Sequence, residues 1–136
     1  MPAADDVRVA IRTDADVVTA RQEARAMGSE LGFSSTDLTL LATAISEVAR
    51  NITTYAGEGD VRLRVLSQDG RRGIEVLATD EGPGIADVEL AMRDGYTTGN
   101  GLGLGLPGTR RLVDDFELQT APGAGTTIRL VKWSRA

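Results

Sequence analysis

The chain has 136 residues, of which 41% are apolar and 26% charged, and these values indicate one soluble domain spanning residues 1–136. It contains no cysteine and no histidine, which excludes disulfide and thiol chemistry and removes the commonest general base and transition-metal ligand. The net charge of −5 argues against nucleic acid as a partner, and no apolar run approaches the roughly 20 residues of a membrane span, so we expect a cytoplasmic protein.

The first half of the chain predicts one strand followed by two helices. Apolar residues at every second position predict a strand over 7–11. The segment "TDAD" then supplies an N-cap and early carboxylates for a helix that ends near Leu31. A second helix opens at "SSTD" and stops at "AGEGD", with the clearest helical periodicity in the chain. Its apolar residues are Leu38, Leu41, Ile45, Val48, Ile52 and Tyr55.

The second half predicts two pairs of strands with a loop and a helix between them. The strands at 61–67 and 73–79 are joined by the turn "QDGRRG", and the arginines that alternate with their apolar residues are expected to form a solvated face. A loop-rich stretch from Asp80 to Gly105 precedes a helix over roughly 107–115. The segments "FELQTA" and "TTIRLVKW" predict a final strand pair joined by "PGAG". Strands segregated from helices favour an α+β fold, a two-layer sandwich with a mixed sheet and helices on one face.

The glycine-rich stretch "YTTGNGLGLGLPGT", residues 96–109, indicates backbone that comes very close to a ligand. A Walker A loop does not fit, because Thr109 and Arg110 stand where that motif needs lysine and then serine or threonine. A dinucleotide-binding turn matches in spacing from Gly103 to Gly108, but that motif follows a strand, and here loop residues precede it. A eukaryotic-type kinase is excluded as well, since the chain has no histidine for its catalytic loop.

Three further segments accompany the glycine run and change its interpretation. Glu47 and Asn51 stand four residues apart on one face of the second predicted helix, off its apolar stripe. The segment "DEGPG" follows at residues 80–84, "GLGLG" at 101–105, and "GAGTT" from residue 123. Each fragment alone is most often a solvated helix edge, a tight turn or a hairpin loop. Together, in this order, they resemble the Bergerat-fold ATPases, the superfamily that includes gyrase, the histidine kinases and MutL.

This resemblance implies ATP as the ligand and assigns the adenine to the "DEGPG" segment. A carboxylate such as Asp80 accepts a hydrogen bond from the adenine amino group. Gly82 and Gly84 let the backbone pass close to the flat base, as no larger residue would. Thr127, or its neighbour Thr126, holds a water against the base.

The phosphates and a Mg²⁺ ion are assigned to the glycine run and to the second helix. Backbone N–H groups of residues 101–105 face the phosphates, together with the positive end of the helix that follows. Magnesium takes few ligands from the protein, and the amide oxygen of Asn51 suits that role. The stretch from Ile85 to Leu102 is expected to form a mobile lid. The remaining expected nucleotide contacts are Ile85, Thr98, Gly101, Leu102, Gly103, Leu104 and Gly105.

A narrower resemblance extends from about Val7 to Trp133. The segments "ATAISEVARNITTYAGEG", "DEGPGI", "DGYTTGNGLGLGLPGTRRLVDDF" and "GAGTTIRLVKW" are similar to the RsbT family, the small switch serine/threonine kinases of bacterial stress signalling. Anti-sigma kinases of the RsbW and SpoIIAB type often carry histidine where this chain has Tyr55. The resemblance implies a serine or threonine of a STAS-domain protein as the substrate, such as the RsbS and RsbR components of the stressosome. It also implies an RsbU-like serine phosphatase, which the released kinase activates.

For phosphoryl transfer of this kind, we expect Glu47 to be the base that orients or deprotonates the substrate hydroxyl. Arg50 either pairs with Glu47 or reaches the γ-phosphate, and a simple surface ion pair on the helix explains it equally well. Two other functions remain open. One is an anti-sigma factor or ATP-binding module of the RsbW and SpoIIAB type that sequesters a partner. The other is an isolated ATP-binding domain of a sensor kinase, which the absent phosphoacceptor histidine disfavours.

Overall fold

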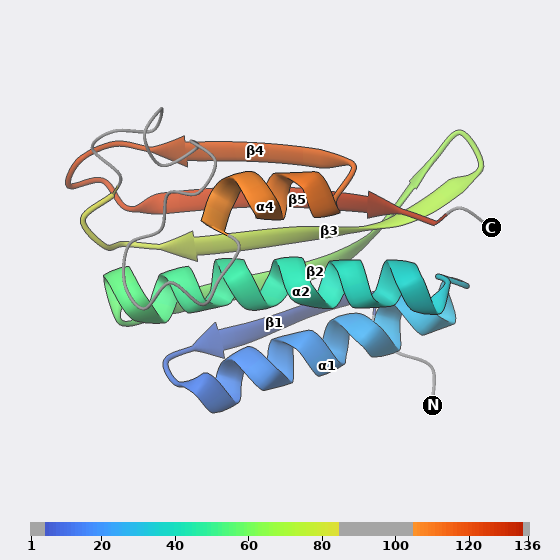
Figure 1. Ribbon diagram of the computed structural model, residues 1–136, viewed down its shortest axis with the longest axis horizontal. Coiled ribbons are helices and arrows are strands. Elements are labelled where there is room, and N and C mark those ends of the chain that lie inside the picture. Colours follow the sequence, from blue (N-terminus) through green and yellow to red (C-terminus); the bar gives the residue numbers. More distant parts are fainter. Residues whose placement is uncertain (1–4, 85–104, 135–136) are drawn as a thin grey trace.

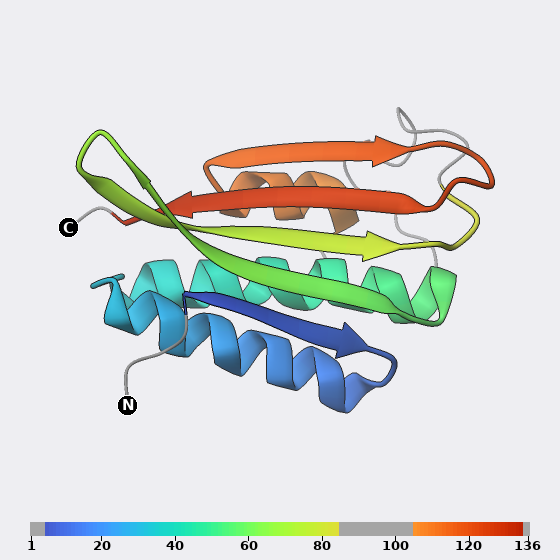
Figure 2. The same ribbon diagram turned by 180° about the vertical axis from the view of Figure 1, so that it is seen from behind.

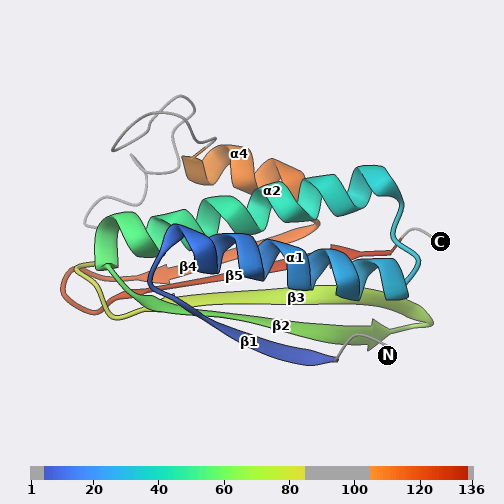
Figure 3. The same ribbon diagram turned by 90° about the horizontal axis from the view of Figure 1, so that it is seen from below.

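The computed structural model describes residues 5–84 and 105–134 and arranges them in two layers (Figure 1). A five-stranded sheet forms one layer, and the described α-helices cover one of its faces (Figure 3). In chain order the elements are β1 (Asp6–Ile11), α1 (Asp14–Glu30), α2 (Ser35–Asn51), a π-helical turn (Ile52–Ala56), β2 (Gly59–Gln68), β3 (Arg71–Asp80), α4 (Gly105–Leu112), β4 (Asp115–Thr120) and β5 (Thr126–Trp133). This arrangement confirms the expected α+β class with helices on one face. Within the described ranges, no helix combines the length and the apolar character needed to cross a membrane.

The sheet is antiparallel at every junction between the described strands, in the order β1-β2-β3-β5-β4. The expectation of a mixed sheet was wrong on this point. The reason is the position of β5, which turns back from β4 and inserts between β4 and β3. β3 and β4 run in the same direction, but they are not neighbours and therefore form no parallel pair.

Both long helices begin where the sequence predicts, at residues that cap them. The hydroxyl of Thr13 accepts a hydrogen bond from the backbone N–H of Asp16, and the Asp16 carboxylate accepts one from the N–H of Thr13. Another hydrogen bond, donated by the N–H of Arg12, is the main cause that holds the pKa of Asp16 below its ordinary value. Ser34 caps the second helix by accepting from the N–H of Asp37. Local sequence thus sets where α1 and α2 begin.

Helix α2 is the central helix of its layer, with α1 on one side and α4 on the other (Figures 1 and 3). Its apolar residues Leu41, Ile45 and Val48 are fully buried against the helix-facing side of the sheet. Because α2 is flanked on both sides, polar residues near its C-terminal end are shielded as well. Glu47, which lies near that end, is only 9% exposed.

The opposite face of the sheet, turned toward the viewer in Figure 2, carries a row of paired charges. Glu75 lies at its centre, and its two carboxylate oxygens contact Arg64 of β2 at 2.8 Å and Arg129 of β5 at 2.7 Å. Arg129 also approaches Glu117 of β4, at 3.6 Å. The hydrogen bond to Glu75 raises the pKa of Arg129 above its ordinary value. The arginines of β2 therefore do lie on an ion-paired outer face, as the alternation predicts.

Replacing Glu75 by alanine should lower the free energy of unfolding by about 1–3 kcal/mol, because two guanidinium groups lose the carboxylate between them. Within residues 5–84 and 105–134, Nε of Arg64 already has no hydrogen-bond partner. Glu117→Ala is the matched control: this side chain is 61% exposed and its ion pair is longer, so the loss should stay below about 1 kcal/mol. Urea denaturation of both variants measures the difference, and equal losses would contradict the central role of Glu75.

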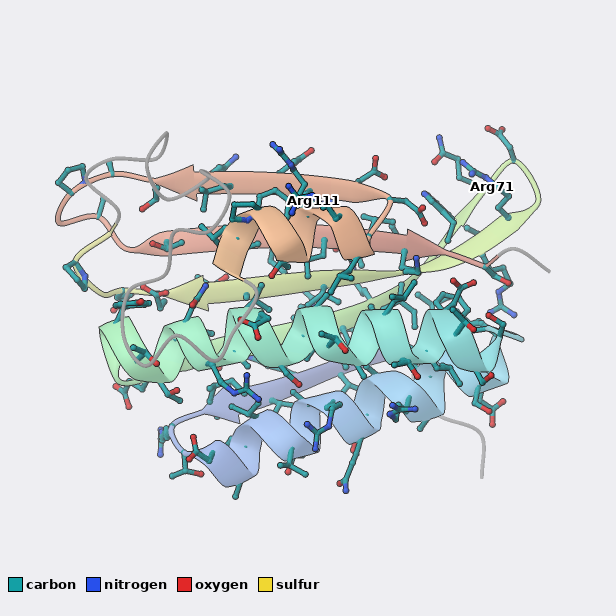
Figure 4. The ribbon with its side chains drawn as sticks, in the orientation of Figure 1. Arg71 and Arg111 are labelled. Carbon is teal, nitrogen blue, oxygen red and sulfur yellow. The ribbon has the colours of Figure 1, made fainter. Side chains whose placement is uncertain are left out.

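A cation–π contact lies at the end of the sheet where β3 begins and β5 ends. The guanidinium carbon of Arg71 lies 4.6 Å from the centre of the Trp133 ring. Figure 4 shows Arg71 beside the turn of the β2–β3 hairpin, where the strand register pairs it with Gln68. The backbone N–H of Trp133 donates a hydrogen bond of 2.7 Å to the carboxylate of Asp114. These contacts tie the last residues of β5 to the rest of the sheet.

Candidate functional site

Polar residues singled out from the sequence gather at the other end of the molecule, where α2 and β3 end and β5 begins (Figure 1, left). Asn51 is the last residue of α2, Asp80 the last of β3, and Thr126 the first of β5. The pairing register sets Asp80 directly opposite Thr126. The π-helical turn that follows Asn51 packs against β3. Three segments that are far apart in the sequence therefore meet at this end of the sheet.

Asp80 is held in one orientation by its own turn. Its Oδ1 accepts a hydrogen bond of 2.9 Å from the backbone N–H of Gly82. Among the residues that the structure describes, its Oδ2 accepts no hydrogen bond, and the side chain is only partly buried. One carboxylate oxygen is therefore open to accept a hydrogen bond from a ligand.

Gly82 and Gly84 have close neighbours within the protein itself. A Cβ atom at Gly82 would lie 2.6 Å from the Cβ of Ala56 in the π-helical turn. Gly84 has a φ of +75°, and a Cβ atom there would collide with the backbone carbonyl of Ala121. The packing of this loop therefore requires both glycines, and their contact with a base stays a prediction.

The turn between β4 and β5 holds the other side of the same loop. The backbone N–H of Gly123 donates a hydrogen bond of 2.7 Å to the carbonyl of Pro83. The hydroxyl of Thr120 donates to the carbonyl of Gly125 at 3.0 Å and lies 3.0 Å from the hydroxyl of Thr126. Sequence reasoning missed Thr120. The hairpin predicted around "PGAG" could have revealed this residue, because pairing the two strands from that turn sets Thr120 opposite Thr126.

The strand register places Thr126 and Thr127, the two alternatives for the threonine that holds a water against the base, on opposite faces of the sheet. Thr126 stands opposite Asp80, so both side chains lie on the helix-facing side of the sheet. Thr127 stands opposite Thr79, and its side chain lies on the outer face. Of the two threonines, Thr126 is the one that shares a face with Asp80.

Glu47 and Arg50 form an ion pair on α2, one turn before the end of the helix. The Nη1 of Arg50 lies 3.3 Å from the Oε1 of Glu47. The Glu47 side chain is well shielded, whereas half of the Arg50 side chain is exposed. This pairing is one of the two arrangements considered for Arg50. A shielded carboxylate beside one half-exposed cation can accept a proton from a neighbouring hydroxyl group.

Helix α4 begins at Gly105 and directs its N-terminal end toward the same end of the molecule (Figure 1). It ends at Leu112, three residues earlier than predicted. The reason is that Asp114, just before β4, is already bonded to β5: its N–H donates to the carbonyl of Val131 at 2.9 Å. The other expected contacts of the nucleotide, which lie outside the described residues, are Ile85, Thr98, Gly101, Leu102, Gly103 and Leu104.

Comparison with known proteins identifies the family. Residues 11–132 match the family model of a histidine kinase-like ATPase domain. Over 131 residues the chain is 46% identical to the serine/threonine-protein kinase RsbT of Bacillus subtilis, which covers 96% of this chain and 98% of that protein. The chain belongs to the RsbT-type serine/threonine kinases. Because the matching domain family is one of ATPases, this RsbT-type kinase uses ATP.

More distant relatives of this RsbT-type kinase share its fold. It is 32% identical over 120 residues to an anti-sigma F factor of Caldanaerobacter subterraneus, which covers 84% of this chain and 82% of that protein. The solved RsbU and RsbW domains of a Mycobacterium tuberculosis protein superpose with a TM-score of 0.66 at 20% identity, covering 98% of this chain but only 34% of that longer one. The mycobacterial sensor histidine kinase MprB superposes with a TM-score of 0.56 at 22% identity, covering 95% of this chain and 97% of that one. These likenesses confirm the expected Bergerat fold.

Proposed function

We propose that residues 1–136 of this kinase act as one domain, which transfers the γ-phosphoryl group of ATP to a serine or threonine of a STAS-domain protein. The expected targets are RsbS-like and RsbR-like components of a stressosome, and the kinase released from them activates an RsbU-like serine phosphatase. We expect this exchange in the cytoplasm, where ATP is supplied. One observation carries the proposal: the Asn51, Asp80 and Thr126 segments meet at one end of the sheet in a chain related to RsbT.

Asp80 is the residue proposed to recognise the base. Its open Oδ2 accepts a hydrogen bond from the 6-amino group of adenine, while Oδ1 stays bound to the N–H of Gly82. Because the turn already fixes the carboxylate, little further ordering is needed on binding. Thr126, on the same face of the sheet, holds a water between the protein and the base.

The phosphates are proposed to lie between the glycine run and the N-terminal end of α4. Backbone N–H groups of residues 101–105 and the positive end of that helix both attract anions. The direction of α4 supports this, since its N-terminal end faces the end of the molecule that carries Asp80 (Figure 1). Ile85, Thr98, Leu102 and Leu104 complete the proposed nucleotide contacts.

Asn51 is proposed to hold Mg²⁺ across the phosphates. In the described part of the chain, no group of three or more carboxylates gathers as metal ligands. A magnesium ion here would depend on one amide oxygen, phosphate oxygens and waters, a ligand set that this ion accepts. When bound, the ion neutralises charge that develops on the phosphates.

Glu47 is proposed to act as the general base. The hydroxyl oxygen of the substrate forms a bond to the γ-phosphorus, while the bond from that phosphorus to the bridging oxygen of ADP breaks. The hydroxyl proton passes to the Glu47 carboxylate, and ADP leaves. The ion pair with Arg50 keeps the carboxylate oriented toward the end of α2.

Removing the amide at residue 51 should uncouple ATP binding from magnesium. For Asn51→Ala we expect the ATP affinity with Mg²⁺ to fall about tenfold or more, to the value measured with a chelator. Thr53→Ala is the control, because it removes another polar group next to Asn51, a hydroxyl that binds the carbonyl of Arg50. Calorimetric titrations with and without Mg²⁺ measure both variants. If Mg²⁺ still strengthens ATP binding by Asn51→Ala as it does in the wild type, Asn51 is not the ligand.

Phosphate transfer tests the proposed function as a whole. The protein is incubated with ATP, Mg²⁺ and candidate STAS-domain proteins, and the products are analysed by mass spectrometry. We expect the gain of one phosphate on a serine or threonine of the STAS-domain protein. ATP binding without transfer to any candidate would contradict this function.

A second function is sequestration of a partner, with ATP serving only as a structural ligand. The relationship to the anti-sigma F factor supports it. The shielded Glu47 favours phosphoryl transfer instead, because a module that only binds needs no base at that place. An ATP-dependent complex with a sigma factor or a phosphatase, without phosphate transfer, would favour the second function.

A further inference from the structure

The π-helical turn after α2 packs against the loop that follows Asp80. Its defining hydrogen bond runs from the backbone N–H of Gly57 to the carbonyl of Ile52, five residues earlier, at 2.9 Å. The turn is anchored at its start by the side chain of Ile52, which is 1% exposed. Such turns are rare, and they are found frequently at functional sites.

The extra residue of the π-helical turn decides which side chain meets the loop. A π turn takes up one more residue than an α turn, so Ala56 stands where residue 55 would stand in an uninterrupted α-helix. Tyr55 is turned outward instead and is 44% exposed. A methyl group therefore faces the loop at a place where an α-helical register presents a phenol ring.

The contact between Ala56 and Gly82 leaves no spare room. A Cβ atom at Gly82 would lie 2.6 Å from the Cβ and 3.0 Å from the Cα of Ala56. The backbone N–H of Gly82 is also the donor that fixes the Asp80 carboxylate. On its other side the loop is held by the hydrogen bond between Gly123 and Pro83. A shift of Gly82 caused by residue 56 therefore reaches Asp80 directly.

We propose that Ala56 is a positioning residue for base recognition, whose size sets the place of the Gly82 backbone and thereby the orientation of Asp80. This inference rests on the proposed role of Asp80 in binding adenine. Guanine carries an oxygen acceptor where adenine carries an amino donor, so a well-placed carboxylate favours ATP over GTP. Residue 56 thus controls nucleotide selectivity without touching the nucleotide.

The test compares ATP and GTP affinities of Ala56→Val, Ala56→Gly and the wild type by calorimetry. Ala56→Val should weaken ATP binding about tenfold and leave GTP binding within about twofold, so the selectivity falls about tenfold. Ala56→Gly loosens the same contact and should lower the selectivity by about threefold. The transfer rate at saturating ATP should stay within about twofold in both, because Glu47 is not displaced. Ala26→Val adds the same two methyl groups at an exposed position of α1 and should change none of these values.

Each outcome decides one question. An unchanged ATP-to-GTP ratio in both Ala56 variants overturns the inference and leaves the kinase function intact. A wild-type protein that binds both nucleotides equally well overturns the role of Asp80 and this inference together. A wild-type protein that prefers ATP but transfers no phosphate overturns the proposed function alone. Thermal melts are recorded for every variant, and if Ala56→Val does not fold, the ratio measured for Ala56→Gly decides.

Discussion

Glu47→Gln should slow phosphate transfer by about 10²–10⁴-fold while the ATP affinity stays within about twofold of the wild type. The amide keeps the size of the side chain but cannot take up the proton of the substrate hydroxyl. Glu47 lies one turn before Asn51 and is 9% exposed, so the substitution removes the base without removing the residues proposed to bind the nucleotide. Single-turnover transfer at saturating ATP, together with calorimetric titration of ATP, separates the two effects.

Glu58→Gln is the matched control for this substitution. Glu58 follows the π-helical turn at the same end of the molecule, but its side chain is 71% exposed and it faces Arg12 at 3.5 Å. We expect a full transfer rate and an unchanged ATP affinity for it. An undiminished rate in Glu47→Gln would remove Glu47 from the mechanism. A loss of ATP affinity as large as the loss of rate would mean that Glu47 shapes the nucleotide site instead.

Asp80→Asn should weaken ATP binding by about 10- to 150-fold, which corresponds to the roughly 1.5–3 kcal/mol of a hydrogen bond to a charged group. An asparagine oxygen can still accept from the N–H of Gly82 and preserve the turn. The amide nitrogen then points toward the amino group of adenine, so two donors face each other. Calorimetric titration of ATP at fixed Mg²⁺ measures the change.

Two further variants make this result specific. Asp80→Ala removes the turn as well as the open oxygen, so it should lose at least as much ATP affinity and also unfold at a lower temperature. Thr79→Val changes a residue of the outer face next to Asp80 and should bind ATP like the wild type. ATP binding by Asp80→Asn equal to that of the wild type would exclude Asp80 as the residue that recognises adenine.

The helices and the ends of the strands could be predicted from local chemistry. Thr13 and Ser34 cap their helices through hydrogen bonds within three residues, so the local sequence alone is enough to predict them. Asn51, Asp80 and Thr126 could be identified because each belongs to a motif of the Bergerat-fold ATPases, and their segments meet in the fold. The family resemblance gave their order, which the comparison with RsbT supports.

Features that depend on tertiary packing could not be predicted in this way. The insertion of β5 between β3 and β4 is set by the whole sheet, and the hairpin alone fits either side. The apolar stripe of α2 continues in the sequence through Tyr55, so periodicity gives no sign that the last turn is π-helical. The burial of Glu47 is a property of the folded chain, and the carboxylate shared by Arg64 and Arg129 requires the strand register.

The stacking of Trp133 against Arg71 has a practical consequence for studying this enzyme. Trp133 is the sole tryptophan of the chain, and it lies seven residues along β5 from Thr126, or about 23 Å at the rise of a strand. We therefore expect its fluorescence to report the integrity of the far end of the sheet and to change little when nucleotide binds. Since the chain also lacks cysteine, a single thiol introduced near Asp80 can carry a second dye, so that unfolding and ligand occupancy are followed separately in one sample.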